Sequence, residues 1–309
     1  MIRDFDDRRR ALSIAAHALA LALFLASALP GRERLAPIVS FALRTEGSAS
    51  TPAQDRSLTT RYRPSRLAVG AYSGLPYNQP SDARLIAPGG TDLTVADIVW
   101  NSEPTTEPVY YGGRLFGWSQ SAPFGAMVDF THTKAISDKT LDHAATGALA
   151  GTAVPTRTQV GDLFKRLEFS HGHNILTLNG LYRLPFGTER LRPYVGAGLG
   201  VALPHTEVWV EGREKRTYQY QYAGPAVQAL AGIEIKATTR LSVFIEYKLS
   251  FARYDAPLSE GETSWLGGDL MEQFRRWRRG EAPPGGRLAT DLTTHQLVGG
   301  VAVALMPGR

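Results

Sequence analysis

The sequence has 309 residues, a formal net charge of +5 and no Cys. The absence of Cys excludes disulfide bonds, a lipid-attached cysteine and thiolate chemistry. The 31 glycines favour strands over helices, because Gly weakens a helix but relieves crowding and permits bends in a small barrel.

The first predicted element is an export signal. Three arginines at positions 8 to 10 precede an apolar run at 11–29, and Ala26-Ser27-Ala28 offers small side chains around a cleavage point. This order is typical of a secretory signal peptide, so residues 1–28 are predicted to be removed from the chain. The alternative is an uncleaved membrane anchor, since about 20 apolar residues can span a bilayer.

The remaining chain divides into an arm and a barrel. Residues 29–64 are rich in Pro, Ser, Thr and Arg and are predicted to form a linker or a periplasmic arm, while residues 65–306 form the barrel domain. Eight strands are predicted in that domain, the second of which is interrupted by a break that contains Pro. They cover 66–74, 92–100 with 109–118, 124–133, 173–184, 192–210, 217–235, 240–254 and 289–305.

The seventh strand carries the strongest periodic signal. From Leu241 to Phe251 every second residue is apolar, and Glu246 and Lys248 lie between them. In a strand this spacing places the apolar side chains on one face and the polar ones on the other. The apolar face could meet lipid, as in a transmembrane barrel, or the core of a soluble sandwich.

Loop lengths decide between these alternatives. The turns at 119–123, 185–190 and 236–239 are short, whereas the loops at 134–170 and 255–287 are long. Outer-membrane barrels have short periplasmic turns and long outer loops. We therefore predict an all-β fold, an eight-stranded antiparallel transmembrane β-barrel, exported to the outer membrane of a Gram-negative bacterium and expected to be a monomer.

Several polar residues are predicted to point into this barrel. An eight-stranded barrel has an interior just wide enough for side chains, so it is not a pore. Buried charges need partners, which favours an internal network of ion pairs and hydrogen bonds. A proton path or an active site in the interior is the alternative. The inward residues are Asp129, Asn179, Arg183, Glu246 and Lys248.

A second polar group is predicted at the outer end of the barrel. Strand direction places several His and carboxylate residues near the same rim, where they could bind a divalent metal or transfer protons. On a regular strand His171 and His173 would face the same side. The alternative is an ordinary solvated rim. The residues are Asp129, His132, Glu168, His171, His173, His205, Glu207, Asp291 and His295.

Two loops are basic. Guanidinium groups bind phosphate oxygens in pairs, and phosphate-bearing lipid headgroups are the expected anions at this surface, rather than nucleic acid. The alternative is a solvated run of charge. One loop holds Arg213, Lys215 and Arg216, and the other holds Arg275, Arg276, Arg278 and Arg279.

Several strings together resemble a known family. They are RLAVGAYSG (66–74), YYGGR (110–114), DFTHTK (129–134), LEFSHGHN (167–174), PYVGAGLGVALPHTEV (193–208) and EYK (246–248). In order and spacing, over about residues 66–305, they resemble small eight-stranded outer-membrane barrels and, more narrowly, the outer-membrane lipid A oxidases.

This resemblance implies an activity and a site. The family oxidises the proximal glucosamine of lipid A, the lipid anchor of lipopolysaccharide, to 2-aminogluconate with molecular oxygen. It implies that the outer-rim residues remove a proton from the anomeric hydroxyl and hold a divalent metal, and that the arginines bind lipid A phosphate. The expected catalytic residues are His132, Glu168, His171 and His173, the expected metal ligands are His205 and Glu207, and the phosphate-binding residues are Arg275, Arg276, Arg278 and Arg279.

Two other functions stay open at this point. A barrel of this kind can have a structural or partner-binding role without catalysis. A lipid A deacylase would instead use one of the Ser and His residues, although no motif marks which Ser.

Overall fold

The computed structural model describes residues 64–188 and 190–306. The predicted signal peptide and all but the last residue of the predicted arm at 29–64 lie outside this range.

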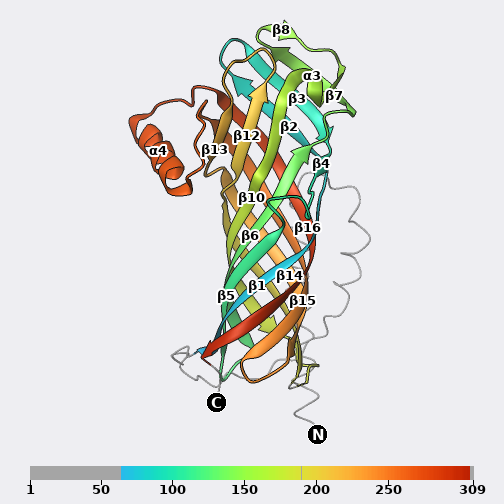
Figure 1. Cartoon of the computed structure of the whole chain (residues 1–309), viewed down its shortest axis with the longest axis vertical. Coiled ribbons are helices and arrows are strands. Elements are labelled where there is room, and N and C mark those ends of the chain that lie inside the picture. Colours follow the sequence, from blue (N-terminus) through green and yellow to red (C-terminus); the bar gives the residue numbers. More distant parts are fainter. Residues whose placement is uncertain (1–63, 189, 307–309) are drawn as a thin grey trace, which may run out of the picture.

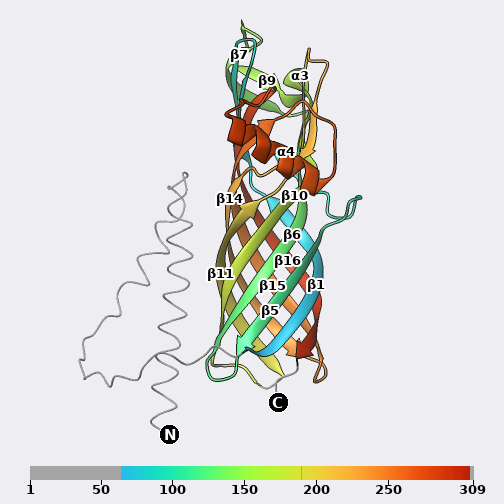
Figure 2. The ribbon, with the colours of Figure 1, turned by 90° about the vertical axis from the view of Figure 1, so that its left-hand side faces the viewer.

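Eight long strands close into an antiparallel barrel (Figures 1 and 2). Each strand pairs with the next in the chain, and the last strand pairs with the first, which leaves no free edge along the barrel wall. The predicted barrel and its number of strands are therefore confirmed within the described residues. The strands are β1 (Pro64–Asn78), β5 (Tyr111–Ser119), β6 (Phe124–Ser137), β10 (Phe164–Arg183), β11 (Leu191–Ala202), β14 (Gly224–Lys236), β15 (Leu241–Leu258) and β16 (Gly286–Met306).

The strand register fixes the tilt of the barrel. A path of paired residues that leaves β1 at Ala68 and crosses every strand returns to β1 at Asn78, ten residues further along. A stagger of this size tilts the strands by about 40°. An eight-stranded barrel with this tilt is narrow and is filled by its own side chains.

Above the barrel, the outer connections are themselves structured, which the sequence did not reveal. Five of the expected boundaries were wrong: the loop at 75–91 contains a strand, 92–118 is not one strand of the barrel, 134–170 contains further strands, and the strands expected at 192–210 and 217–235 are each divided into two. Residues 81–87 pair with the nearby 91–98 as a hairpin, whereas 91–98 also pair with 142–149, which are distant in sequence. The outer elements are β2 (Ser81–Ala87), β3 (Thr91–Ile98), β4 (Trp100–Asn101), β7 (Asp142–Leu149), β8 (Thr152–Ala153), β9 (Arg157–Gln159), α3 (Val160–Leu163), β12 (His205–Val210) and β13 (Thr217–Tyr220).

The loop expected at 255–287 holds a helix, α4 (Leu266–Arg279), which stands beside the barrel (Figure 1). Gly280 ends this helix in the left-handed conformation that glycine adopts readily, with φ 68°. Among the described residues, no helix combines the length and the apolar character needed to cross a membrane.

The two faces of the wall exchange polarity along β15. In its lower half Ile245 is 60% exposed on the outside, while Glu246 and Lys248 are buried inside. In its upper half Arg253 is exposed on the outside and Tyr254 is buried inside. An apolar exterior around a polar interior is the pattern of a barrel in lipid, and the reverse is the pattern of a protein in water.

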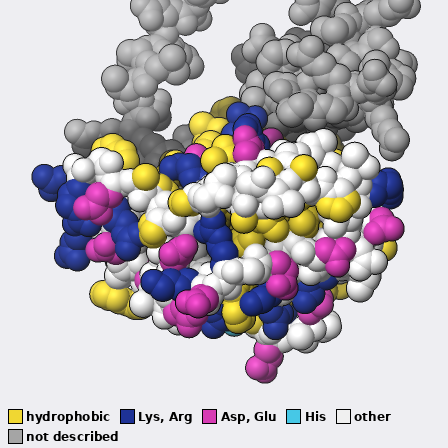
Figure 3. Space-filling model, turned by 90° about the horizontal axis from the view of Figure 1, so that it is seen from above, with side chains coloured by type: hydrophobic (Ala, Val, Ile, Leu, Met, Phe, Trp, Pro, Cys, Tyr) yellow, Lys and Arg dark blue, Asp and Glu magenta, His cyan; other side chains and the backbone are white. Residues whose placement is uncertain are grey.

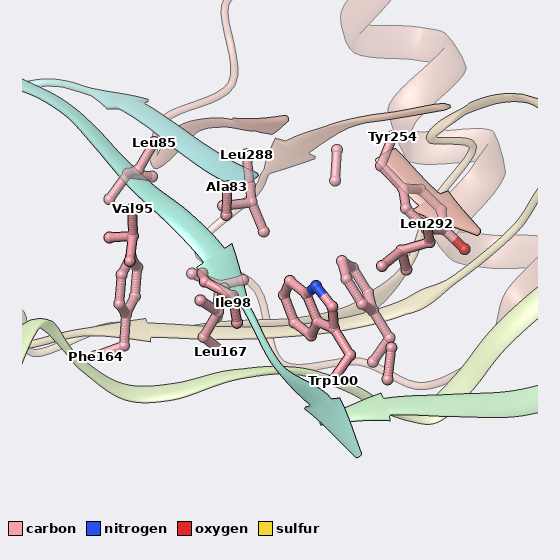
Figure 4. Close-up of a cluster of buried hydrophobic side chains, with 14 of the residues drawn as sticks. Ala83, Leu85, Val95, Ile98, Trp100, Phe164, Leu167, Tyr254, Leu288 and Leu292 are labelled. Carbon is pink, nitrogen blue, oxygen red and sulfur yellow. The ribbon is translucent and has the colours of Figure 1, made fainter. Parts of the chain in front are cut away.

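The upper interior is an apolar core (Figure 4). Tyr254 stacks on Phe169 with ring centroids 4.9 Å apart, and Phe169 lies 6.1 Å from Trp100. The core includes Leu85, Val95 and Ile98 from the outer strands and Phe164, Leu167, Leu288 and Leu292 from the upper parts of β10 and β16. The outer part of the molecule is thus built like a small water-soluble domain on top of a lipid-facing barrel.

The lower interior holds the predicted network of charges. Lys248 Nζ lies 2.5 Å from Asp129 Oδ2, and Arg114 donates two hydrogen bonds, of 3.0 and 2.8 Å, to the Glu246 carboxylate. Arg114 also lies 3.2 Å from Asp129 Oδ1. The side chains of all four residues are almost completely buried. Each charge therefore has an opposite charge beside it, as a buried ionic group requires.

Candidate functional site on the outer wall of the barrel

A β-bulge in β10 separates the two central histidines. The register against β6 shifts between Phe169 and His173, and Gly172 has φ 139°, a conformation that residues with a side chain rarely adopt. As a result His173 points into the barrel, where it hydrogen-bonds with Tyr254 and Thr294, while His171 lies on the outer wall. The expectation that both histidines face one side was wrong because the extra residue reverses the alternation.

Three of the other predicted residues, Glu168, His205 and Glu207, meet His171 on the outside. Side chains alternate along β12 and β13, and the inward residues of β12 join the upper apolar core, so the residues between them face out. We call this group the outer-wall cluster. It consists of Glu168, Ser170, His171, His205, Glu207, Arg216, Tyr218 and Tyr220.

His171 is the most accessible His of the cluster. Its Nε2 lies 3.2 Å from the Tyr218 hydroxyl, and its Nδ1 lies 3.2 Å from Ser170 Oγ. Ser170 in turn donates a hydrogen bond of 3.0 Å to Glu168 Oε1. The side chain of His171 is exposed, whereas Glu168 is buried. The imidazole is thus oriented on both sides and remains open to a ligand.

Two carboxylates lie side by side behind it. Glu168 and Glu207 are directly opposite each other on the paired strands β10 and β12, and both are buried. Burial, and then the neighbouring charge of Glu168, raise the pKa of Glu207. Arg216 limits the repulsion, since its Nη1 lies 2.7 Å from Glu207 Oε1.

His205 lies between two tyrosine rings. The ring centroids of Tyr218 and Tyr220 are 4.4 and 4.6 Å from that of His205, and both rings meet it edge to face. Burial, and then the nearby His171, lower the pKa of His205 to about 4. Its two ring nitrogens are buried and have no hydrogen-bond partner among residues 64–188 and 190–306. His205 is therefore neutral near pH 7.

His132 borders the cluster lower on the wall. Asp129 and Thr131 of β6 contact the inward Lys248, so the alternation turns His132 outward. Its Nδ1 lies 2.8 Å from Asn174 Oδ1, and its ring stacks on Tyr111 with centroids 4.6 Å apart. These contacts fix the orientation of His132 without exposing it.

The His and Glu side chains of the cluster are of the types that bind divalent metals, but they are not arranged around a common metal position. No group of three or more His, Cys, Asp or Glu residues in the described part of the chain has suitable geometry. Arg216 also already occupies the carboxylate of Glu207. Metal binding by His205 and Glu207 stays a prediction, and no step below depends on a metal.

The other predicted residues lie apart from the cluster. Asp291 lies 3.4 Å from Arg253 in an exposed ion pair. His295 is on the outer wall elsewhere, with Nδ1 2.6 Å from the Tyr247 hydroxyl and Nε2 2.7 Å from Gln79. The four predicted phosphate-binding arginines lie on α4, which joins the cluster through the hydrogen bond from Tyr220 N to Asp269 Oδ2, 3.0 Å.

Sequence reasoning missed the tyrosines and Ser170. Tyr218 and Tyr220 have the period of two that marks one face of a strand, and β12 and β13 are consecutive strands that pair as a hairpin. The position of Ser170 on the outer wall depends on the bulge that follows it, which the sequence marks only by Gly172.

Comparisons with known proteins add little beyond the fold. No family model matches this chain, and no curated protein matches it. Among solved structures, Neisserial surface protein A is 12% identical with a TM-score of 0.32, and the match covers 77% of this chain and 96% of that one. Ail of Yersinia pestis is 8% identical with a TM-score of 0.28, and covers 77% and 99%. A designed transmembrane β-barrel is 11% identical with a TM-score of 0.27, and covers 79% and 98%.

Proposed function

We propose that this protein is an outer-membrane enzyme that acts on lipid A in the outer leaflet through the outer-wall cluster. The observation that carries the proposal is where the cluster lies. Its titratable side chains point away from the barrel axis, just above the level at which the outer wall changes from apolar to polar. A lipid headgroup at the membrane surface could reach these side chains there. A soluble substrate would not require a site at the level of the membrane surface.

The level of the cluster follows from strand register. On β15 the outer wall becomes polar at Arg253, beyond Ala252, which pairs with Ala226 of β14. Ala202 of β11 pairs with Gly224, close to the same level, and His205 follows three residues higher. At about 3.3 Å per residue on a strand tilted by about 40°, His205 lies within about 10 Å of the polarity change. This is the depth of lipid headgroups.

The reaction proposed first is oxidation of the proximal glucosamine of lipid A to 2-aminogluconate. The anomeric carbon loses two electrons and two protons to give a lactone, which water opens to the acid, and molecular oxygen takes up the electrons and protons as hydrogen peroxide. His171 is placed to remove the proton of the anomeric hydroxyl, because its imidazole is exposed and oriented by Tyr218 and Ser170.

The neighbouring residues would exchange protons with His171 and supply positive charge for the substrate. Glu207, with its raised pKa, and the neutral His205 can each exchange a proton near His171. The arginines of α4 supply positive charge for lipid A phosphate, since guanidinium groups match phosphate oxygens.

A second candidate reaction is deacylation of lipid A. It is favoured by the contacts of Ser170, whose Oγ lies 3.2 Å from His171 Nδ1 and 3.0 Å from Glu168 Oε1. A Ser, a His and a carboxylate in mutual contact are the parts of a nucleophilic site. Here Ser170 lies between the other two, whereas in a Ser-His-Asp triad the His lies in the middle. This difference places deacylation second.

Mass spectrometry of lipid A separates these functions. Lipid A is isolated from Gram-negative cells with and without the gene, and from cells that carry the His171→Asn variant. Gain of one oxygen that requires His171 supports oxidation, and loss of an acyl chain supports deacylation. Unchanged lipid A in cells that contain the folded barrel would contradict both and leave a structural or partner-binding role.

A further inference from the structure

Helix α4 carries a surface that neither the barrel nor the outer-wall cluster uses. Trp265 is 74% and Trp277 73% exposed, and Phe274, Met271 and Leu266 are also exposed. Monomeric proteins rarely leave so many large apolar side chains together in water. Trp at the boundary between lipid and water is, by contrast, typical of membrane proteins.

The apolar and basic residues occupy different sides of the helix. At 100° per residue, Leu266, Leu270, Phe274 and Trp277 fall on one side, and Arg275, Arg278 and Arg279 fall on another, which Met271 shares. Seen from above, basic side chains gather at the left-hand edge of the molecule, the side on which α4 stands (Figure 3). A helix with an apolar side and an Arg-rich side has the composition of one that lies in the interface of an anionic membrane.

The helix is attached to the barrel by polar contacts only at a few points. Asp269 accepts a hydrogen bond from Tyr220 N, and Gln273 exchanges two hydrogen bonds, each 2.8 Å, with the backbone of Tyr222. Between these contacts and the barrel wall lies a groove of about 870 Å³. Its apolar lining includes Leu203, Ala223 and Pro225 from the wall and Leu270, Phe274 and Trp277 from the helix.

The attachment points set the depth of α4. Tyr222 lies two residues before the start of β14, whose Ala226 pairs with Ala252 at the level where the outer wall changes polarity. Figure 2 shows the helix running across the side of the barrel rather than along it. The apolar groove and the exposed tryptophans are therefore held at the height of lipid headgroups, not above the membrane in water.

We propose that α4 is an interfacial helix that docks on the outer leaflet, with its aromatic side chains among the lipids, lipid in the groove beneath it, and Arg275 and Arg278 on the phosphates of the leaflet. Charge complementarity identifies the occupant. Arg276 and Arg279 are paired with Glu272 and Glu281, while Arg275 and Arg278 are exposed and point to an external anion. This proposal rests on the placement of the barrel in the outer membrane and not on the reaction.

The absence of Cys permits a direct test. The full chain is refolded into phosphatidylcholine vesicles with and without lipid A, and each of three variants, Phe274→Cys, Ile245→Cys and Glu214→Cys, carries one environment-sensitive fluorophore. Ile245 lies on the lipid-facing wall, and Glu214 lies in the loop between β12 and β13. Lipids with a quencher near the headgroup report insertion, and a water-soluble quencher reports exposure.

We expect the label at residue 274 to be quenched by lipid at least threefold more strongly than the label at 214, and more strongly with lipid A than without it. The pair Arg275→Glu and Arg278→Glu should abolish the gain from lipid A, while the control pair Lys139→Glu and Arg157→Glu, both at exposed positions, should retain it. Equal behaviour of the labels at 274 and 214, with the label at 245 still quenched by lipid, would overturn the proposal. The experiment measures membrane contact and not lipid A oxidation, so failure of this proposal can be distinguished from failure of the proposed function.

Discussion

Glu168 and Glu207 lie directly opposite each other on β10 and β12, buried on the outer wall of the barrel, with Arg216 2.7 Å from Glu207 and Arg166 3.5 Å from Glu168. Two carboxylates this close do not both ionise readily, and the pKa of Glu207 is accordingly raised by burial and by Glu168. This shift makes the stability of the outer wall depend on pH.

Loss of Arg216 should expose this repulsion. We expect Arg216→Gln to lower the free energy of unfolding by about 1–2 kcal/mol, between the values for exposed and buried ion pairs. A carboxyl whose folded pKa is raised contributes stability at low pH that is lost as the pH rises through that pKa, so the defect should be larger at about pH 8 than at about pH 5. Urea unfolding in vesicles measures it. The double variant Arg216→Gln with Glu207→Gln should lose this dependence, and an equal defect at both pH values would contradict the assignment.

His205 should give the opposite dependence. Its folded pKa of about 4 lies below the ordinary 6.5, so the unfolded chain binds a proton more readily between these values. Stability from this residue is then present above pH 6.5 and is lost as the pH falls towards 4. Relative to His205→Asn, the wild-type protein should lose about 1–3 kcal/mol over this range. Parallel pH profiles for the two proteins would show that His205 is not held neutral.

Lys248 should matter for folding and not for chemistry. Lys248→Met leaves Asp129 with Arg114 as its charged partner, beside neutral hydrogen bonds from Tyr72 and Gln228, and should destabilise the barrel by about 3–5 kcal/mol, as expected when one partner of a buried ion pair is removed. Adding Asp129→Asn should recover part of the loss. Urea midpoints give the stabilities, and lipid A composition per folded molecule should stay unchanged. A variant as stable as the wild type would show that the interior charges are not coupled.

Gly172 should be required for the position of both histidines. Its φ of 139° strains any other residue, so Gly172→Ala should cost about 1–3 kcal/mol and disturb the bulge. Modification of lipid A should fall with it, because His171 would no longer be held on the outer wall. Gly113→Ala in the neighbouring β5 is the control, since Gly113 has open space and an ordinary φ. Equal loss in both variants would remove the special role of the bulge.

The barrel follows from the sequence because alternation of two faces is a local property. The period of two at 241–251 predicted β15, its lipid-facing residues and the inward Glu246 and Lys248 correctly. Strand β3 corresponds to the predicted segment at 92–100, although it belongs to the outer sheet and not to the barrel, whereas β2 and β7 were missed. The pairing of β3 with β7 joins segments that are distant in sequence. Helix α4 was missed although Leu266, Leu270, Phe274 and Trp277 have helical spacing.

For the site, residue types were predictable and their directions were not. Strand direction brought His132, Glu168, His171, His205 and Glu207 to one end of the barrel, as expected. The face of the wall on which each one lies depends on the bulge at Gly172 and on the hairpin of β12 and β13. One inserted residue is enough to send His173 inside and His171 outside.

The central claim is that the outer-wall cluster modifies lipid A, and a comparison of two histidines tests it most directly. Lipid A is analysed by mass spectrometry from cells that carry the wild type, His171→Asn or His295→Asn, with heat-modifiable migration as the check that each barrel folds. His295 lies on the outer wall but outside the cluster. We predict one added oxygen in lipid A with the wild type and His295→Asn, and none with His171→Asn. Undiminished oxidation with His171→Asn, or unmodified lipid A with the folded wild type, would contradict the claim.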